Sequence, residues 1–150
     1  MTIKTSSWFD QLPADHVRIG ISRGRPRGMA AGYRTFTRLA PGAWFNSVSV
    51  EEYDRRYRAE ILGPLDAAVV ARQLTDIARG GVAVILCYER PNTGKWCHRA
   101  LVAEWLFNAL GIVVPEFGFE NVPQAQHPLM HPSLRGRQLT ASRGGSGLLL

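Results

Sequence analysis

Alternating and continuous runs of hydrophobic residues predict the strands of this chain. Apolar and polar residues alternate over 17–22, Val-Arg-Ile-Gly-Ile-Ser, and a period of two is typical of a strand. The segment 82–87, Val-Ala-Val-Ile-Leu-Cys, is continuously apolar, which indicates a central strand covered on both faces, with helices on both sides. Shorter strands are expected within 33–39 and at 112–114.

Three other segments carry apolar residues at helical spacing. The first helix, at about 50–62, begins at Ser49, which forms a capping box with Glu52 because each side chain can satisfy a free backbone N–H of the other. The second helix lies within 66–80 and has an aspartate as its N-cap. The third covers 101–109, and a glycine follows both the second and the third helix.

The order of these elements is strand, helix, helix, strand, helix, strand. It predicts a Rossmann-like α/β layered domain, with a small, mainly parallel sheet flanked by helices. A chain of 150 residues with 45% hydrophobic content suits one domain, which we place at residues 1–120. From residue 121 the periodicity gives way to Pro, His, Gly, Ser and Arg, which predicts a basic, flexible tail over 121–150.

The net charge of +6 is concentrated in the first third of the chain. Residues 1–46 carry seven Lys and Arg side chains against two Asp, whereas the middle of the chain is mildly acidic. A concentrated positive charge attracts anions, so we expect an anionic small molecule or a nucleic acid as the partner. No apolar run approaches the roughly 20 residues of a membrane-spanning helix, and we expect a cytoplasmic protein without a membrane partner.

The third helix begins beside Cys97-His98-Arg99, at the sheet edge where α/β proteins bind ligands. A cysteine in the first turn of a helix has a lowered thiol pKa, which makes Cys97 a candidate nucleophile. His98 is a candidate acid or base, and Glu89 is a candidate carboxylate base or ion-pair partner. Arg99, which we expect to turn toward the rim, and Arg90 are candidates for binding a phosphate or carboxylate.

Simple packing is the alternative for several of these side chains. An inward cysteine is usually a small core residue, which is the interpretation we favour for Cys87 at the end of the apolar strand. We expect reduced thiols, with a single bridge between Cys87 and Cys97 as the alternative. A metal site formed by these cysteines and His98 lacks the familiar ligand spacing and needs a fourth ligand, such as His127 or His131. We therefore predict no metal.

A second candidate site follows the first predicted strand, in the segment 22–28, Ser-Arg-Gly-Arg-Pro-Arg-Gly. Arg23, Arg25 and Arg27 would form an anion-binding loop, because the glycines let backbone N–H groups approach the ligand. If the strands are parallel, this loop opens at the same sheet edge as the Cys-His-Arg segment. The alternative is a solvated basic loop, since the segment is neither a Walker nor a dinucleotide-binding motif.

Several motifs together resemble a known family. They are Leu-Cys-Tyr-Glu-Arg at 86–90, Cys-His-Arg at 97–99, Val-Ala-Glu-Trp-Leu at 102–106, Arg-Pro-Arg-Gly at 25–28, Leu-Ala-Pro-Gly at 39–42 and Glu-Tyr-Asp-Arg-Arg-Tyr at 52–57. Their pattern is similar to the signature of the bacterial domain-of-unknown-function family 488, and the likeness covers about 17–114. The resemblance implies a compact α/β fold and a site drawn from the Cys-Tyr-Glu and Cys-His-Arg segments, without an established activity. This chain departs from the commoner pattern by a longer insert at 91–96.

Two functional hypotheses follow from the sequence. The first is an enzyme or ligand-binding domain that holds a phosphate- or nucleotide-like molecule between the loop at 23–27 and the Cys-His-Arg segment. The second is a nucleic-acid-binding module in which the basic loop and the tail contact phosphates and the Cys-His-Arg segment is structural. A partner-docking protein without a ligand is a third alternative. No motif points to a particular cofactor.

Overall fold

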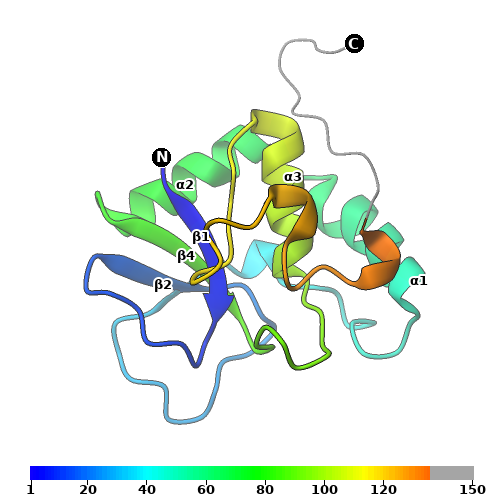
Figure 1. The fold of residues 1–150 in the computed structure, drawn as a ribbon, viewed down its shortest axis with the longest axis horizontal. Coiled ribbons are helices and arrows are strands. Elements are labelled where there is room, and N and C mark those ends of the chain that lie inside the picture. The colour runs from blue at the N-terminus through cyan, green and yellow to red at the C-terminus, as the bar shows by residue number, and fades with distance from the viewer. Residues whose placement is uncertain (136–150) are drawn as a thin grey trace.

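The computed structural model describes residues 1–135 and contains a four-stranded parallel sheet (Figure 1). The strands lie in the order β1-β4-β2-β3, and their bounds are β1 (Ile3–Ser7), β2 (His16–Gly20), β3 (Arg34–Thr35) and β4 (Val82–Cys87). The apolar β4 is a central strand, as its sequence predicts. The fold is therefore the small α/β layered domain with a parallel sheet that the order of elements predicts.

The predicted helices are present with the expected ends. α1 (Val50–Arg56) continues into a π-helical turn at Tyr57–Leu62, and the Ser49 hydroxyl accepts the backbone N–H of Glu52. α2 (Ala67–Ala78) begins after an aspartate whose carboxylate accepts two backbone N–H groups. α3 (Arg99–Leu110) ends at a glycine in the left-handed conformation.

The two faces of the sheet are covered differently. Alternate residues of β4, such as Ile85, join the large core that contains all three helices. The residues between them, such as Leu86, pack against Trp8 and the loop around Met29 and Tyr33. The prediction of helices on both sides is therefore wrong for one face, where the indole and loop side chains take their place.

Two short elements differ from the sequence-based expectation. β1 was not predicted, because three of its residues, Thr5, Ser6 and Ser7, are polar although they are fully buried. The strand expected at 112–114 is absent from the described part of the chain, and only an isolated bridge joins Thr5 to Glu116. Segment 33–39 forms the two-residue β3 and a short 3-10 turn.

The segment after residue 120 packs on the domain as far as the structure describes it. Residues 121–135 include two 3-10 turns, and His127, Leu129, Met130 and Leu134 are buried. The Leu129 carbonyl accepts the backbone N–H of Cys97, which ties this segment to the start of α3. The first half of the predicted tail is thus part of the core, and the second half lies outside the described residues.

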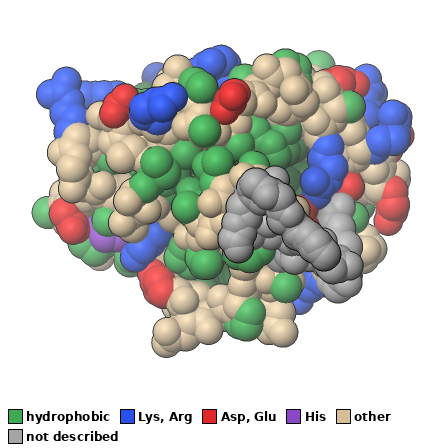
Figure 2. Space-filling model, turned by 90° about the horizontal axis from the view of Figure 1, so that it is seen from above, with side chains coloured by type: hydrophobic (Ala, Val, Ile, Leu, Met, Phe, Trp, Pro, Cys, Tyr) green, Lys and Arg blue, Asp and Glu red, His purple; other side chains and the backbone are tan. Residues whose placement is uncertain are grey.

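The surface seen in Figure 2 carries an apolar area in its middle, with Lys, Arg, Asp and Glu side chains around the margin. Among the helices of residues 1–135, none has the length and apolar character needed to cross a membrane.

Candidate functional site

A cavity of about 460 Å³ lies at the carboxyl edge of the sheet. Because β1, β2 and β4 are parallel and in register, their last residues and the loops after them meet at this edge. Arg23 approaches the cavity from the loop after β2, and Glu89 from the segment after β4. Cys97 and His98 reach it from the turn before α3. The two segments singled out by sequence therefore face one cavity.

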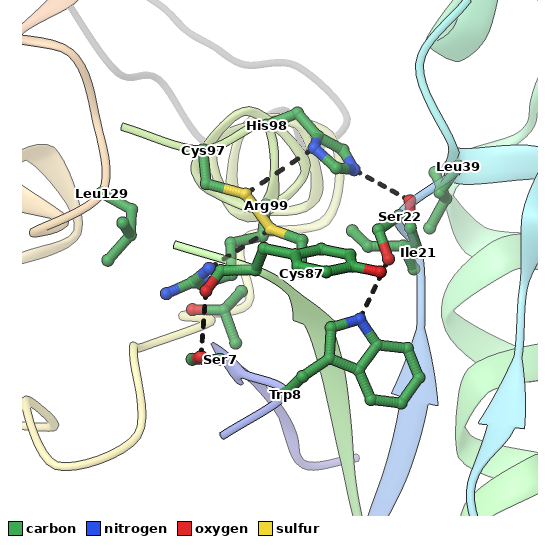
Figure 3. The surroundings of a disulfide bond; sticks show 12 residues. Ser7, Trp8, Ile21, Ser22, Leu39, Cys87, Cys97, His98, Arg99 and Leu129 are labelled. Carbon is green, nitrogen blue, oxygen red and sulfur yellow. Dashed lines mark hydrogen bonds between the residues drawn. A yellow bond between two sulfur atoms is a disulfide. The ribbon is translucent and has the colours of Figure 1, made fainter. Parts of the chain in front are cut away.

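The two cysteines are joined by a disulfide between the end of β4 and the start of α3 (Figure 3). Both side chains are buried, and both line the cavity. The sequence-based expectation of reduced thiols is thus wrong for this structure, which has the single bridge that was the alternative. A disulfide sulfur is an electrophile, so the predicted nucleophilic role of Cys97 requires reduction of this bond.

His98 is buried beside the disulfide and has a defined tautomer. Its Nε2 lies 2.9 Å from the Ile21 carbonyl oxygen, which can only accept, so Nε2 carries the proton. Nδ1 is left with its lone pair and faces the Cys97 sulfur at 3.7 Å (Figure 3). Burial lowers the pKa of His98 to about 4, against the opposing effect of the Ile21 hydrogen bond. The imidazole is therefore neutral at physiological pH.

The sequence predicts that Arg99 turns toward the rim, and this prediction is wrong. Its side chain is fully buried, and Nε and Nη2 donate to the two carboxylate oxygens of Glu116 at 2.9 and 2.7 Å. Nη1 donates to the Cys87 sulfur at 3.2 Å. The paired guanidinium lies behind the disulfide instead of lining the cavity, so it is not available to bind a ligand there.

Glu116 also anchors a buried hydrogen-bond chain that sequence analysis missed. The Leu129 N–H donates to His127 Nδ1, so His127 Nε2 carries the proton and donates to the Thr5 hydroxyl at 2.7 Å. Thr5 in turn donates to Glu116 at 2.7 Å. Burial, with a smaller effect of nearby Arg charges, lowers the pKa of His127 to about 3. His127 therefore supports the ion pair and is not a metal ligand folded over the cysteines.

Glu89 and Arg90 lie on different sides of the chain after β4. The half-buried Glu89 lines the cavity, whereas Arg90 is exposed, donates to the Phe9 carbonyl at 3.4 Å and stacks over that ring. Tyr53 also lines the cavity, and its burial, with a smaller effect of the Glu89 charge, raises its phenol pKa far above the ordinary range. The carboxylate thus faces the cavity and Arg90 does not.

The arginine side chains of the loop at 22–28 line two separate hollows. Arg23 lines the cavity, where it donates to the Pro41 carbonyl at 3.0 Å and lies over the Phe45 ring. Arg25 and Arg27 line a separate, open hollow beside the loop. Of the three arginines in this loop, only Arg23 lines the same cavity as the Cys97–His98 turn.

Aromatic side chains form much of the cavity wall, which the sequence did not predict. They are Phe45, Tyr53, Tyr88 and Trp96. The Trp96 ring meets the Tyr53 ring edge to face, with centroids 4.8 Å apart. The only sequence signal was indirect, since Tyr88 and Trp96 directly follow and precede the two cysteines.

Comparison with known proteins identifies the family of this chain but assigns it no activity. Neither the curated proteins nor the solved structures gave a match to this chain. Residues 3–110 match the family described as the active DUF488-N3 subclade. This range contains β1 to β4, the arginine loop and the Cys97–His98 turn, and the chain therefore belongs to the DUF488 family.

Proposed function

We propose that the cavity at the carboxyl edge of the sheet binds a small anionic molecule with a flat ring, of the phosphate-bearing, nucleotide-like class. The observation that carries the proposal is the combination of one arginine with aromatic walls in a single cavity. Its volume of about 460 Å³ lies within the range of roughly 300–1,000 Å³ typical of small-molecule sites.

Arg23 is the residue to which we assign the anionic group. Among the described residues that line the cavity it is the only Lys or Arg. The Pro41 carbonyl and the Phe45 ring hold its guanidinium in place. A planar guanidinium has five N–H donors, so one bond to the protein leaves others able to bind a phosphate or carboxylate.

The aromatic residues and Glu89 supply the other half of the recognition. A flat ring can lie against Tyr53, Trp96 or Phe45, because aromatic faces stack favourably on planar groups. The Glu89 carboxylate can only accept hydrogen bonds, so it favours a ligand that also carries hydroxyl or amino groups. This combination of an anion, a ring and hydrogen-bond donors distinguishes a nucleotide-like molecule from a simple phosphate.

Calorimetric titration with a panel of nucleoside mono- and diphosphates tests the proposal. We expect Arg23→Ala to weaken binding by roughly tenfold or more, because a charge-assisted hydrogen bond contributes about 1.5–3 kcal/mol. Arg27→Ala is the matched control, since this arginine belongs to the same loop but lines the other hollow, and it should bind like the parent protein. Equal losses in both variants would indicate a general charge effect and refute the assignment.

A second candidate function is binding of single-stranded nucleic acid. One observation favours it: three arginines lie over exposed or half-exposed rings near this edge, in the pairs Arg23–Phe45, Arg25–Tyr33 and Arg90–Phe9. Bases stack on such rings while arginines contact phosphates. Oligonucleotide affinity should then fall steeply with salt, and the Arg25 and Arg27 side chains should matter as much as Arg23.

A further inference from the structure

We propose that Cys87, Cys97 and His98, once the disulfide is reduced, bind a zinc-class divalent metal ion whose fourth coordination position faces the cavity. Metal binding by these three residues does not depend on the ligand proposed above. The role of the open fourth position in holding an anionic ligand does rest on that proposed function.

The donor atoms already lie close together. Among residues 1–135, these three buried side chains place two sulfurs and one imidazole nitrogen within 4.8 Å of one another. A tetrahedral zinc site has Zn–S and Zn–N bonds of about 2.3 and 2.0 Å, which separates the donor atoms by roughly 3.5–4 Å. The Cα atoms of the two cysteines are 7.2 Å apart, so side-chain rotation can admit an ion between the sulfurs.

His98 is held in the orientation of a metal ligand. Its Nε2–H is fixed by the Ile21 carbonyl, and its Nδ1 lone pair is directed at the Cys97 sulfur. A ligating histidine almost always donates its other ring N–H to a carbonyl or carboxylate in this way. On the opposite side, the Arg99 guanidinium donates to the Cys87 sulfur, an interaction that stabilises a thiolate.

The cavity supplies the open position. Each of the three residues lines the cavity, so an ion at this place would have protein on three sides and the cavity on the fourth. Two Cys and one His with a water or ligand is a combination that catalytic zinc sites use. Two thiolates balance the charge of the ion, and a fourth ligand from the cavity completes the tetrahedron.

Metal binding follows reduction of the Cys87–Cys97 disulfide. Two equivalents of a small-molecule thiol reduce the disulfide to two thiols and leave as the oxidised disulfide of that thiol. The metal ion then displaces two protons, one from each cysteine, while His98 binds as the neutral imidazole. Exchange with the oxidised disulfide of that small-molecule thiol would reverse the sequence, because it re-forms the Cys87–Cys97 bond, is itself reduced to two thiolates and leaves the ion without its sulfur ligands.

Cobalt titration under anaerobic conditions, after reduction with a phosphine, tests metal binding. The full-length reduced protein should bind one Co²⁺ per chain with a thiolate-to-cobalt charge-transfer band and tetrahedral visible bands, and Zn²⁺ should displace the cobalt. The protein with its disulfide intact should show neither band. Reduced protein that binds no Co²⁺, or binds it without the charge-transfer band, overturns the proposal.

Variants make the test specific. Cys97→Ser and His98→Ala should each lower cobalt affinity by roughly 100-fold or more, since even residues that only orient a ligand change affinity by about 10–100-fold. His131→Ala, a histidine outside the cluster, should leave it unchanged. A substitution at a metal-binding residue can destabilise the protein, so thermal unfolding supplies a second measurement. Zn²⁺ should raise the melting temperature of the reduced parent protein but not that of Cys97→Ser.

The same proteins separate this inference from the proposed function. Arg23→Ala should weaken nucleotide binding by roughly tenfold or more and keep one cobalt site, because its side chain is not a metal ligand. Nucleotide binding that persists in reduced protein without any cobalt site refutes the metal proposal alone. A cobalt site in a protein that binds no nucleotide refutes the proposed function alone.

Discussion

Acid should destabilise this protein through a buried histidine, His127, that stays neutral in the native state down to about pH 3. His127 donates to Thr5 and accepts from the Leu129 N–H, so both ring nitrogens are already engaged in the neutral form. Burial holds its pKa at about 3, against an ordinary value of 6.5. The nearby Glu116 carboxylate does not favour the protonated ring, because the Arg99 guanidinium already neutralises it.

The size of this loss of stability follows from the pKa of His127 in the unfolded chain, 6.5, and in the native protein, about 3. Above pH 6.5 the ring is neutral in both states, and its contribution to stability is fully present. Below pH 6.5 the unfolded chain binds a proton that the native protein does not, so the free energy of unfolding falls by about 1.4 kcal/mol per pH unit until about pH 3. Between pH 7 and pH 5 the loss from this one residue is about 2 kcal/mol.

Urea unfolding followed by tryptophan fluorescence, at pH 7 and pH 5, measures this loss. His127→Asn provides the comparison, because the Asn side-chain oxygen can still accept the Leu129 N–H but does not titrate. The variant should be less stable than the parent at pH 7, and the difference should shrink by about 2 kcal/mol at pH 5. His98, whose pKa is lowered to about 4, contributes equally to both proteins and cancels.

A difference between parent and His127→Asn that stays constant from pH 7 to pH 5 would refute the reasoning. It would mean that His127 titrates normally in the native protein, and that the buried hydrogen bonds do not fix its neutral form.

Three further substitutions test the packing. Glu116→Gln leaves the buried Arg99 charge without its counter-charge and should lower the free energy of unfolding in urea by about 3–5 kcal/mol. Gly20→Ala places a methyl carbon 2.2 Å from the Trp8 ring and should cost about 1–3 kcal/mol in the same assay. Asp66→Ala removes the N-cap of α2 and should lower the unfolding free energy by about 1 kcal/mol.

Glu116→Gln and Gly20→Ala each have a matched control variant. Glu120→Gln removes only an exposed ion pair with Lys4 and should change stability by less than about 1 kcal/mol. Gly24→Ala places its methyl 3.8 Å from the nearest side-chain atom, so it should be nearly neutral. If Glu116→Gln costs no more than Glu120→Gln, the buried ion pair does not have the role assigned to it. If Gly20→Ala and Gly24→Ala lower the free energy of unfolding equally, the clash with Trp8 is excluded.

The sequence predicts the elements whose signals are local. The N-caps Ser49 and Asp66 and the apolar run of β4 each determine their structure within a few residues, and both caps and the central strand are confirmed. The capping box is confirmed only for its Ser49 half, because the Glu52 carboxylate binds Arg55. β1 could not be recognised, because its buried residues include Thr5 and Ser7, whose hydroxyl groups bond to partners more than 80 positions away. Hydropathy does not distinguish a polar side chain with a buried partner from one in water.

The part of the candidate site that depends only on where strands and helices end could also be predicted. Cys97, His98, Glu89 and Arg23 come from strand ends and a helix start, so topology alone brings them to one edge. Arg99 differs, because its position depends on an acceptor 17 residues away in a segment without periodicity. No helical pattern reveals such a partner, and a charged residue at a helix start is ordinarily exposed.

The Arg99–Glu116 pair has a consequence for folding during synthesis. The sheet, the three helices and both cysteines are complete by residue 110, yet the carboxylate that neutralises Arg99 and the Leu129 carbonyl that binds Cys97 come later in the chain. A nascent chain that has emerged only to residue 110 must leave this arginine in water or bury it unpaired. We therefore expect the core to close only after the segment containing Glu116 has left the ribosome.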